Sequence, residues 1–142
     1  MSFAMEFTAV DGDIDELGHV NNAVWVRWIQ AVATAHWEAV APAEHQAAYA
    51  WVVTRHEIDY RGNMVAGETV TAETWVGVPR GARFDRHVHF TGSDGRVRVE
   101  AVTTWALIDR ASGRLLRVRP DIAAPFLDSP YLAASRTQSG ND

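Results

Sequence analysis

The residues best suited to chemistry lie together in one polar segment, residues 11–22, which reads DGDIDELGHVNN. It contains three aspartates, one histidine and two asparagines, and it comes directly before residues 23–40, which contain neither Gly nor Pro. If the second segment is a helix, its first backbone N–H groups and its dipole favour negative charge where the polar residues lie. The pattern therefore predicts an active site at the start of a helix.

Metal binding is the first chemistry to consider for this segment. The aspartates have the spacing of the first ligands of an EF-hand loop, but Glu16 stands where that loop needs Gly and Asn22 where it needs a bidentate Glu. A mixed site of Asp13, Asp15 and His19 is chemically plausible. The other histidines, however, are scattered along the chain and provide no further cluster of ligands. We therefore predict no metal.

Catalysis by a carboxylate is the second chemistry to consider for this segment. A carboxylate in a partly desolvated pocket can act as a nucleophile or as a base toward water, and the free N–H groups of a helix can hold an oxyanion. Hydrolysis of an activated ester by such a pair needs no cofactor. The chain has no Cys and no GxSxG sequence, so Cys and Ser acyl-enzymes are poorly supported.

The same residues also have simpler structural uses. Asp15 can serve as a turn residue, and Gly18 is most simply explained by a positive φ. Either Asn21 or Asn22 is expected to be the N-cap of the helix. From the residues alone, the catalytic and the structural interpretations both remain open.

The elements around this segment decide where its side chains lie. Residues 23–40 predict one helix of about five turns whose apolar side chains point to nearly every side. A helix that is apolar all round is buried, so we expect a central core helix. It should end at Ala41 and Pro42, because Pro removes a donor and restricts the residue before it.

From residue 51 onward, apolar and polar residues alternate with a period of two, as is typical of β-strands. Along residues 82–91 this alternation places Arg86 among the apolar residues and His87 and His89 on the outward side. Strands are expected over residues 3–10, 51–61, 68–78, 82–91, 96–109 and 115–118, and helical turns over 43–50 and 120–126. A run of strands after a helix predicts an α+β fold with a mostly antiparallel sheet. Its open edges favour pairing with a second copy of the chain.

The composition sets wider limits. With 142 residues, 47% of them hydrophobic, the chain is expected to form one globular domain over residues 1–128, followed by a loose tail over 129–142. The net charge of -5 argues against nucleic-acid binding, and the absence of Cys excludes disulfides. Neither a signal peptide nor an apolar run of about 18 residues is evident. We therefore expect a cytoplasmic protein that does not bind membranes.

The polar segment also resembles a known family motif. DIDELGHVNN at residues 13–22, followed by VWVRW at 24–28, resembles the DxDxxGHVNNxxYxxY signature of hot-dog-fold acyl-CoA thioesterases. These are relatives of 4-hydroxybenzoyl-CoA thioesterase and of the plant fatty acyl-carrier-protein thioesterases. The likeness continues through residues 55–61 and 67–70 to the turn at 109–114.

This resemblance implies a hot-dog fold, in which an antiparallel sheet wraps around a long central helix. It also implies a homodimer or homotetramer whose sheets pair edge to edge, with active sites at the interface. The implied activity is hydrolysis of an acyl-CoA or an acyl-carrier-protein thioester, and it requires no cofactor because CoA is part of the substrate. By this resemblance Asp15 is the nucleophile or the base, and the N–H of Asn22 is an oxyanion donor. His19 and Asn21 line the same pocket.

Substrate binding is less well marked in the sequence. Phosphates of CoA need exposed cations, and Arg80 and Arg83 are the best local cluster, with Arg86 on the same strand. A solvated basic turn is an equally good explanation of these arginines. Trp25 is the tryptophan closest to the predicted pocket and is our candidate for a substrate contact.

Two departures from the family pattern leave other functions open. Many relatives carry a glutamate in the helix where this chain has Gln30, and the plant enzymes have Asn where this chain has Leu17. A hot-dog protein that binds acyl-CoA without turnover is therefore one alternative. A hot-dog dehydratase or hydratase is another, although those enzymes use a differently placed His and an acidic residue of the helix.

Overall fold

The computed structural model describes residues 2–128, so the predicted tail at 129–142 lies outside the described residues. Within residues 2–128, three helices, five strands and one short 3-10 turn follow each other. Their bounds are β1 Phe3–Thr8, η1 Asp11–Asp13, α1 Asn22–Val40, α2 Ala43–Ala48, β2 Tyr49–Tyr60, β3 Thr69–Val76, β4 Arg83–Gly92, β5 Val97–Asp109 and α3 Pro120–Asp128. None of the helices that the structure describes is long and apolar enough to cross a membrane.

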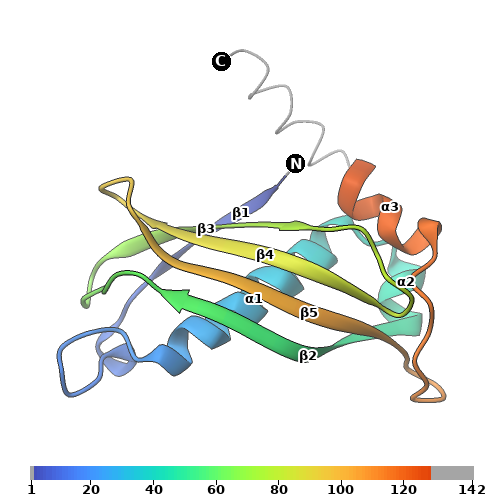
Figure 1. Ribbon diagram of the computed structural model, residues 1–142, viewed down its shortest axis with the longest axis horizontal. Coiled ribbons are helices and arrows are strands. Elements are labelled where there is room, and N and C mark those ends of the chain that lie inside the picture. Colours follow the sequence, from blue (N-terminus) through green and yellow to red (C-terminus); the bar gives the residue numbers. More distant parts are fainter. Residues whose placement is uncertain (1, 129–142) are drawn as a thin grey trace, which may run out of the picture.

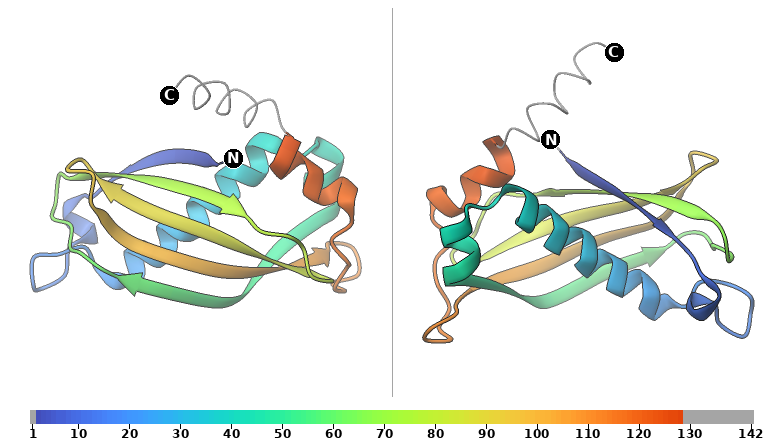
Figure 2. Two further views of the ribbon diagram at one scale, coloured as in Figure 1. Left: turned by 45° about the horizontal axis from the view of Figure 1, so that its top comes forward. Right: turned by 180° about the vertical axis from the view of Figure 1, so that it is seen from behind.

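The strands form one antiparallel sheet in the order β1-β3-β4-β5-β2, which leaves β1 and β2 at its edges. The helix α1 runs along one face of this sheet, and α3 lies near one end of it (Figures 1 and 2). The predicted α+β class and the hot-dog arrangement of a sheet around a long helix are confirmed. The five long strands begin and end within about two residues of their expected bounds.

The short strand expected at 115–118 is wrong. This segment pairs with the sheet only through an isolated bridge between Leu115 and Ile108. Leu116 then donates its backbone N–H to Leu107, whereas Val118 donates to Gly81 in a different loop. The segment changes partner within a few residues because it is turning toward α3, and it therefore has no continuous ladder.

Within one chain, α1 buries a single face rather than all sides, which corrects the expectation of an all-round buried helix. The residues off that face are mostly polar or Ala, and Arg27, Gln30 and Glu38 are exposed there. The spacing of the buried residues follows the helical repeat, so that they form one continuous stripe against the sheet. They are Val24, Trp25, Trp28, Ile29, Val32, Ala33, His36 and Trp37.

On the sheet, β4 shows the expected alternation. Phe84, Val88 and Phe90 are buried toward α1, whereas His87 and His89 are half-buried on the other face. Arg86 occupies an inward position in this series and is only 2% exposed. A cation therefore lies in the core between the sheet and α1.

Candidate active site

The loop before α1 is anchored by Asp13, which is buried. One of its carboxylate oxygens accepts a hydrogen bond from Nη2 of Arg27 at 2.8 Å, and the other accepts from the backbone N–H of Val10 at 3.0 Å. The backbone oxygen of Asp13 also accepts from the N–H of Asn21. Because both carboxylate oxygens are used in this way, Asp13 fixes the loop against the helix and is not free to react.

Asp15 stands inside a tight turn that begins and ends with the bridge between Ile14 and Val20. Its Oδ1 accepts the backbone N–H groups of Leu17 at 2.9 Å and of His19 at 3.2 Å. The interpretation of Asp15 as a turn residue is therefore confirmed. Its Oδ2 has no hydrogen-bond partner among the described residues, and the side chain is half-buried. One oxygen holds the turn while the other is available to a water or a substrate.

Gly18 supplies the turn with its positive φ of 82°, as expected. His19 returns the chain toward the helix, and its carbonyl accepts the N–H of Asp15 at 2.8 Å. The imidazole of His19 is half-buried beside the same turn and makes no hydrogen bond with the described residues. The imidazole can therefore interact with a bound molecule.

The helix begins immediately after this turn. Asn21 is the N-cap, and its side-chain oxygen accepts the N–H of Ala23 at 2.9 Å, which confirms that one of the two asparagines has this role. The backbone N–H of Asn22, the first helical residue, has no partner among the residues described. It is thus free to donate to an oxyanion, with the positive end of the helix dipole behind it.

Sequence reasoning did not single out Tyr60 on β2, whose hydroxyl donates to the carbonyl of Asn22 at 3.4 Å. Burial raises the pKa of this phenol above its ordinary value, so the hydroxyl keeps its proton at neutral pH. Tyr60 lies within the segment at 55–61 that carries part of the family resemblance. The family resemblance over residues 55–61 was therefore the feature of the sequence that could have led to Tyr60.

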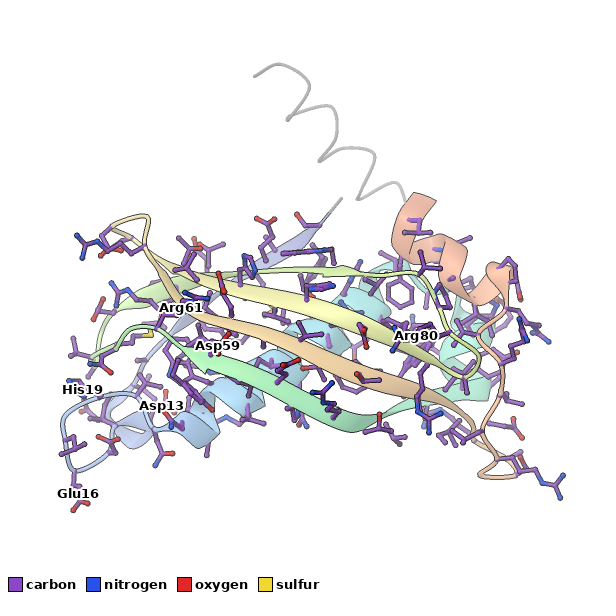
Figure 3. The ribbon with its side chains drawn as sticks, viewed as in Figure 1. Asp13, Glu16, His19, Asp59, Arg61 and Arg80 are labelled. Atoms are coloured by element: carbon purple, nitrogen blue, oxygen red, sulfur yellow. The ribbon has the colours of Figure 1, made fainter. Side chains whose placement is uncertain are left out.

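The predicted phosphate ligands lie elsewhere. Arg80 is at the opposite end of the sheet from His19 (Figure 3), and it forms two hydrogen bonds with the carboxylate of Asp85, at 3.0 and 3.3 Å. This contact lowers the pKa of Asp85. Arg83 is exposed beside it. Within one chain the structure thus brings together Asp15, His19 and the two asparagines, but not the two arginines.

Two further residues lie where the sequence did not place them. Trp25 is 2% exposed and packs edge-on against Trp28 and Phe90 in the core, so a substrate could reach it only if that core opened. Arg86 does not extend the exposed cluster of arginines, because it faces α1 from the inward side of β4. No group of three or more His, Cys, Asp or Glu side chains within residues 2–128 converges on a metal-sized site.

Comparisons with known proteins identify the family and the fold. The sequence model of the thioesterase-like superfamily matches residues 10–126. No curated protein sequence matches the chain significantly.

Among solved structures, the fold is similar to a 1,4-dihydroxy-2-naphthoyl-CoA thioesterase from Synechocystis, with a TM-score of 0.78 and 12% identity over 91% of this chain and 98% of that one. It is also similar to a thioesterase from Thermus thermophilus complexed with coenzyme A and Zn, with a TM-score of 0.75 and 19% identity over 87% and 90% of the two chains. A DHNA-CoA thioesterase from Staphylococcus aureus gives a TM-score of 0.74 and 15% identity over 99% and 93%.

Proposed function

We propose that this chain, which belongs to the thioesterase-like superfamily, hydrolyses the thioester of an acyl-CoA or of an acyl-carrier protein to the free acid and the thiol. One observation carries the proposal. Oδ2 of Asp15 is unpartnered among the described residues beside the start of α1, where the N–H of Asn22 is also unpartnered. A base or nucleophile and an oxyanion donor are the two groups that thioester hydrolysis requires.

The reaction can follow two routes with the same residues. In the first, Oδ2 of Asp15 takes a proton from water, and the resulting hydroxide adds to the thioester carbon. The oxyanion accepts the N–H of Asn22, the C–S bond breaks, and the thiolate takes the proton from Asp15. In the second, Oδ2 attacks the carbon itself and expels the thiolate, and water then hydrolyses the mixed anhydride. In both, the two N–H bonds to Oδ1 keep the carboxylate in one orientation.

A second copy of the chain would complete this site. The strand β2 is an edge strand, and Tyr60 at its end contacts Asn22. Arg83 lies near the beginning of β2, because Arg83 and Val52 are both paired with Ala106 of β5. Antiparallel pairing of two β2 edges would set the beginning of one strand beside the end of the other. It would therefore bring the exposed Arg83 of a second copy toward Asp15, where it could bind a phosphate of CoA.

The experiment is an assay of thiol release from a panel of acyl-CoA and acyl-carrier-protein substrates, repeated with Asp15→Asn. Asn keeps an oxygen for the two N–H bonds of the turn but cannot act as a base, so we expect kcat to fall at least about a hundredfold. Glu16→Gln is the matched control, because Glu16 is exposed next to Asp15. Equal rates for Asp15→Asn and the unmodified chain would rule out the assigned role.

Binding of acyl-CoA without turnover is the second candidate, and the exposed Gln30 favours it, because Gln30 stands where many relatives have a carboxylate. Calorimetric binding of CoA together with no thiol release from any substrate would identify this function. A dehydratase or hydratase is less well supported, because the first turn of α1 has no acidic residue.

A further inference from the structure

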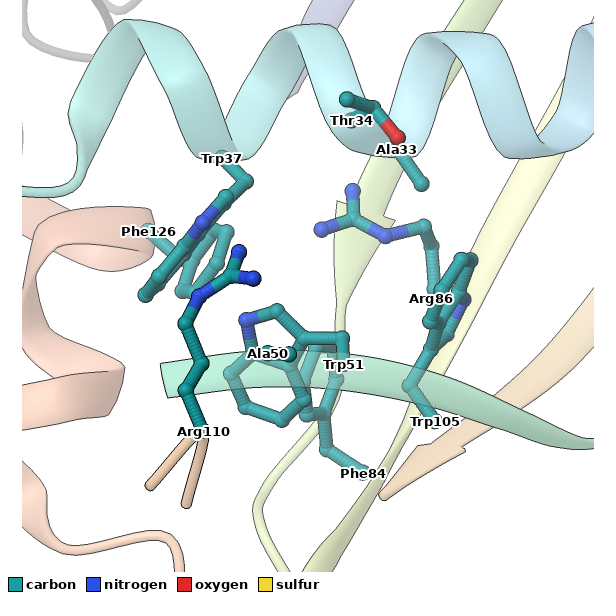
Figure 4. Close-up of a pocket in the computed structure, with 10 residues that line it drawn as sticks. All are labelled: Ala33, Thr34, Trp37, Ala50, Trp51, Phe84, Arg86, Trp105, Arg110 and Phe126. Carbon is teal, nitrogen blue, oxygen red and sulfur yellow. The ribbon is translucent and has the colours of Figure 1, made fainter. Parts of the chain in front are cut away.

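A cavity of about 170 Å³ lies beside the second half of α1, between that helix, the sheet and α3. At 1.5 Å of rise per residue, Trp37 in its wall lies about 22 Å along α1 from Asn22, so within one chain this cavity is remote from the helix start. Half of the residues in its walls are aromatic, and they come from elements far apart in the chain (Figure 4). The aromatic residues are Trp37, Trp51, Phe84, Trp105 and Phe126.

Arg86 forms one side of the cavity and is an unusual core residue. Its Nη1 donates to Nδ1 of His36 at 2.9 Å and to Oγ1 of Thr74 at 3.1 Å. Burial lowers the pKa of the guanidinium to about 9, which still leaves it a cation at neutral pH. Burial and the charge of Arg86 also lower the pKa of His36 to about 3, so His36 is neutral and can accept this bond.

No carboxylate within residues 2–128 compensates the charge of Arg86. Both of its hydrogen bonds use Nη1, so Nε and Nη2 have no hydrogen-bond partner among these residues. These two N–H groups lie on the same edge of the planar guanidinium, and such an edge matches the two oxygens of a carboxylate. A buried cation with free donors is costly unless an anion meets it.

Arg110 places a second cation on the side of the cavity opposite Arg86. Its Nε donates to the backbone oxygens of Gln46 and Tyr49 at 3.2 and 2.9 Å, which holds the exposed side chain at the cavity. It has no carboxylate partner in the described part of the chain. Figure 4 shows the guanidinium groups of Arg86 and Arg110 on opposite sides of the same space. Two cations without an anion between them favour a bound anion.

We propose that this cavity binds a small aromatic carboxylate, with the carboxylate between Arg86 and Arg110 and the ring among the aromatic walls. The size is suitable, because a cavity of about 150 Å³ can hold one benzene ring. The nucleotide of CoA is far larger than this space. The indole N–H groups of Trp51 and Trp105 have no partner among the described residues and could provide further donors after small side-chain shifts. The site takes a free carboxylate and needs no thioester, so its binding can be measured separately from the activity proposed above.

Calorimetric titration of the full chain with benzoate tests the proposal, with benzamide as a neutral ligand of the same shape and butanoate as a carboxylate without a ring. We expect saturable binding of one benzoate per chain, and binding at least tenfold weaker for benzamide and for butanoate. Heat that does not saturate with benzoate, or equal affinity for benzamide, would overturn the proposal.

Substitutions of Arg110 and Arg86 test whether these two residues bind the carboxylate. Arg110→Ala should weaken benzoate binding at least tenfold, because it removes a charge-assisted hydrogen bond, whereas Arg117→Ala should leave it unchanged, since Arg117 is exposed and does not line the cavity. Arg86→Met should weaken binding at least a hundredfold. If Arg86→Met does not fold, Arg110→Ala and benzamide still decide the outcome. Unchanged affinity in Arg110→Ala would contradict the assignment.

Discussion

At the start of α1, the carboxylate of Asp15 and the free N–H of Asn22 come from one short loop, whereas the cavity beside the second half of α1 draws on residues of α1, β2, β4, β5 and α3. The first site presents an acid next to the positive end of a helix dipole. The second holds a cation inside the core. A site made of neighbouring residues leaves a motif in the sequence, but a site assembled by the sheet topology does not.

The largest effect that would test this contrast between the two sites is a loss of thioester turnover, which we expect from Asn22→Pro at the start of α1. Pro is well accepted at the first helical position, and the φ of -61° and ψ of 140° at Asn21 suit a residue before Pro. The substitution removes the backbone N–H that we assign to the oxyanion, together with the exposed side chain. We expect thioester turnover to fall about a hundredfold or more, with an unchanged melting temperature.

Asn22→Ala is the control for this variant, because it removes the exposed side chain but keeps the N–H. It should retain turnover. If Asn22→Pro hydrolyses thioesters as fast as Asn22→Ala does, the oxyanion is stabilised by another group.

The next effect concerns the cation in the core. Arg86 has no carboxylate partner among the described residues, and replacing it by Met exchanges a buried charge for an apolar side chain of similar length. We expect the free energy of unfolding to rise by about 1–2 kcal/mol, measured by urea denaturation, although the anion site is lost. Arg98→Met is the matched control, because Arg98 pairs with Glu68 and Asp94 at 3.4 Å each. The Arg98→Met variant should have a lower free energy of unfolding. If Arg86→Met and Arg98→Met lose the same stability, the absence of a carboxylate partner at Arg86 does not matter for stability.

The last effect is a pH dependence that originates at His36. In the unfolded chain His36 gains a proton below its ordinary pKa of 6.5, whereas in the folded chain its pKa is lowered to about 3. The unfolded state therefore binds more protons between these values, and stability falls as the pH falls. The contribution is at most about 1.4 kcal/mol per pH unit. Urea denaturation between pH 7 and pH 4 should show a shallower loss in His36→Gln than in the unmodified chain, and identical slopes would contradict this.

Much of the fold can be predicted from the sequence, because the features that decide it are local. The absence of Gly and Pro over 23–40 and the period-two alternation after residue 51 correctly locate α1 and the long strands. The sequence also predicts the end of α1 correctly and its start to within one residue, and it narrows the N-cap to two asparagines, of which Asn21 has that role. The family motif leads to Asp15 and Asn22, although their catalytic roles remain predictions.

The failures have one physical origin, which is contact between distant segments. The alternation of β4 points Arg86 inward, but its charge favours an exposed position. Only the pairing of β4 with β3, together with the packing of α1, shows that Thr74 and His36 are available to hold it. The aromatic cavity likewise depends on Phe126 of α3 reaching Trp37, which no local pattern reveals.

The double use of the Asp15 carboxylate limits which substitutions this position can accept during evolution. Under the proposed function, a replacement has to accept two N–H groups of the turn with one oxygen and still offer a second oxygen as a base. Asn meets only the first requirement, Ser has a single oxygen, and Glu carries its carboxylate one methylene farther away. A lineage that lost the acid could therefore keep a well-formed loop through Asn, and would become a binding protein of the same shape in a single mutational step.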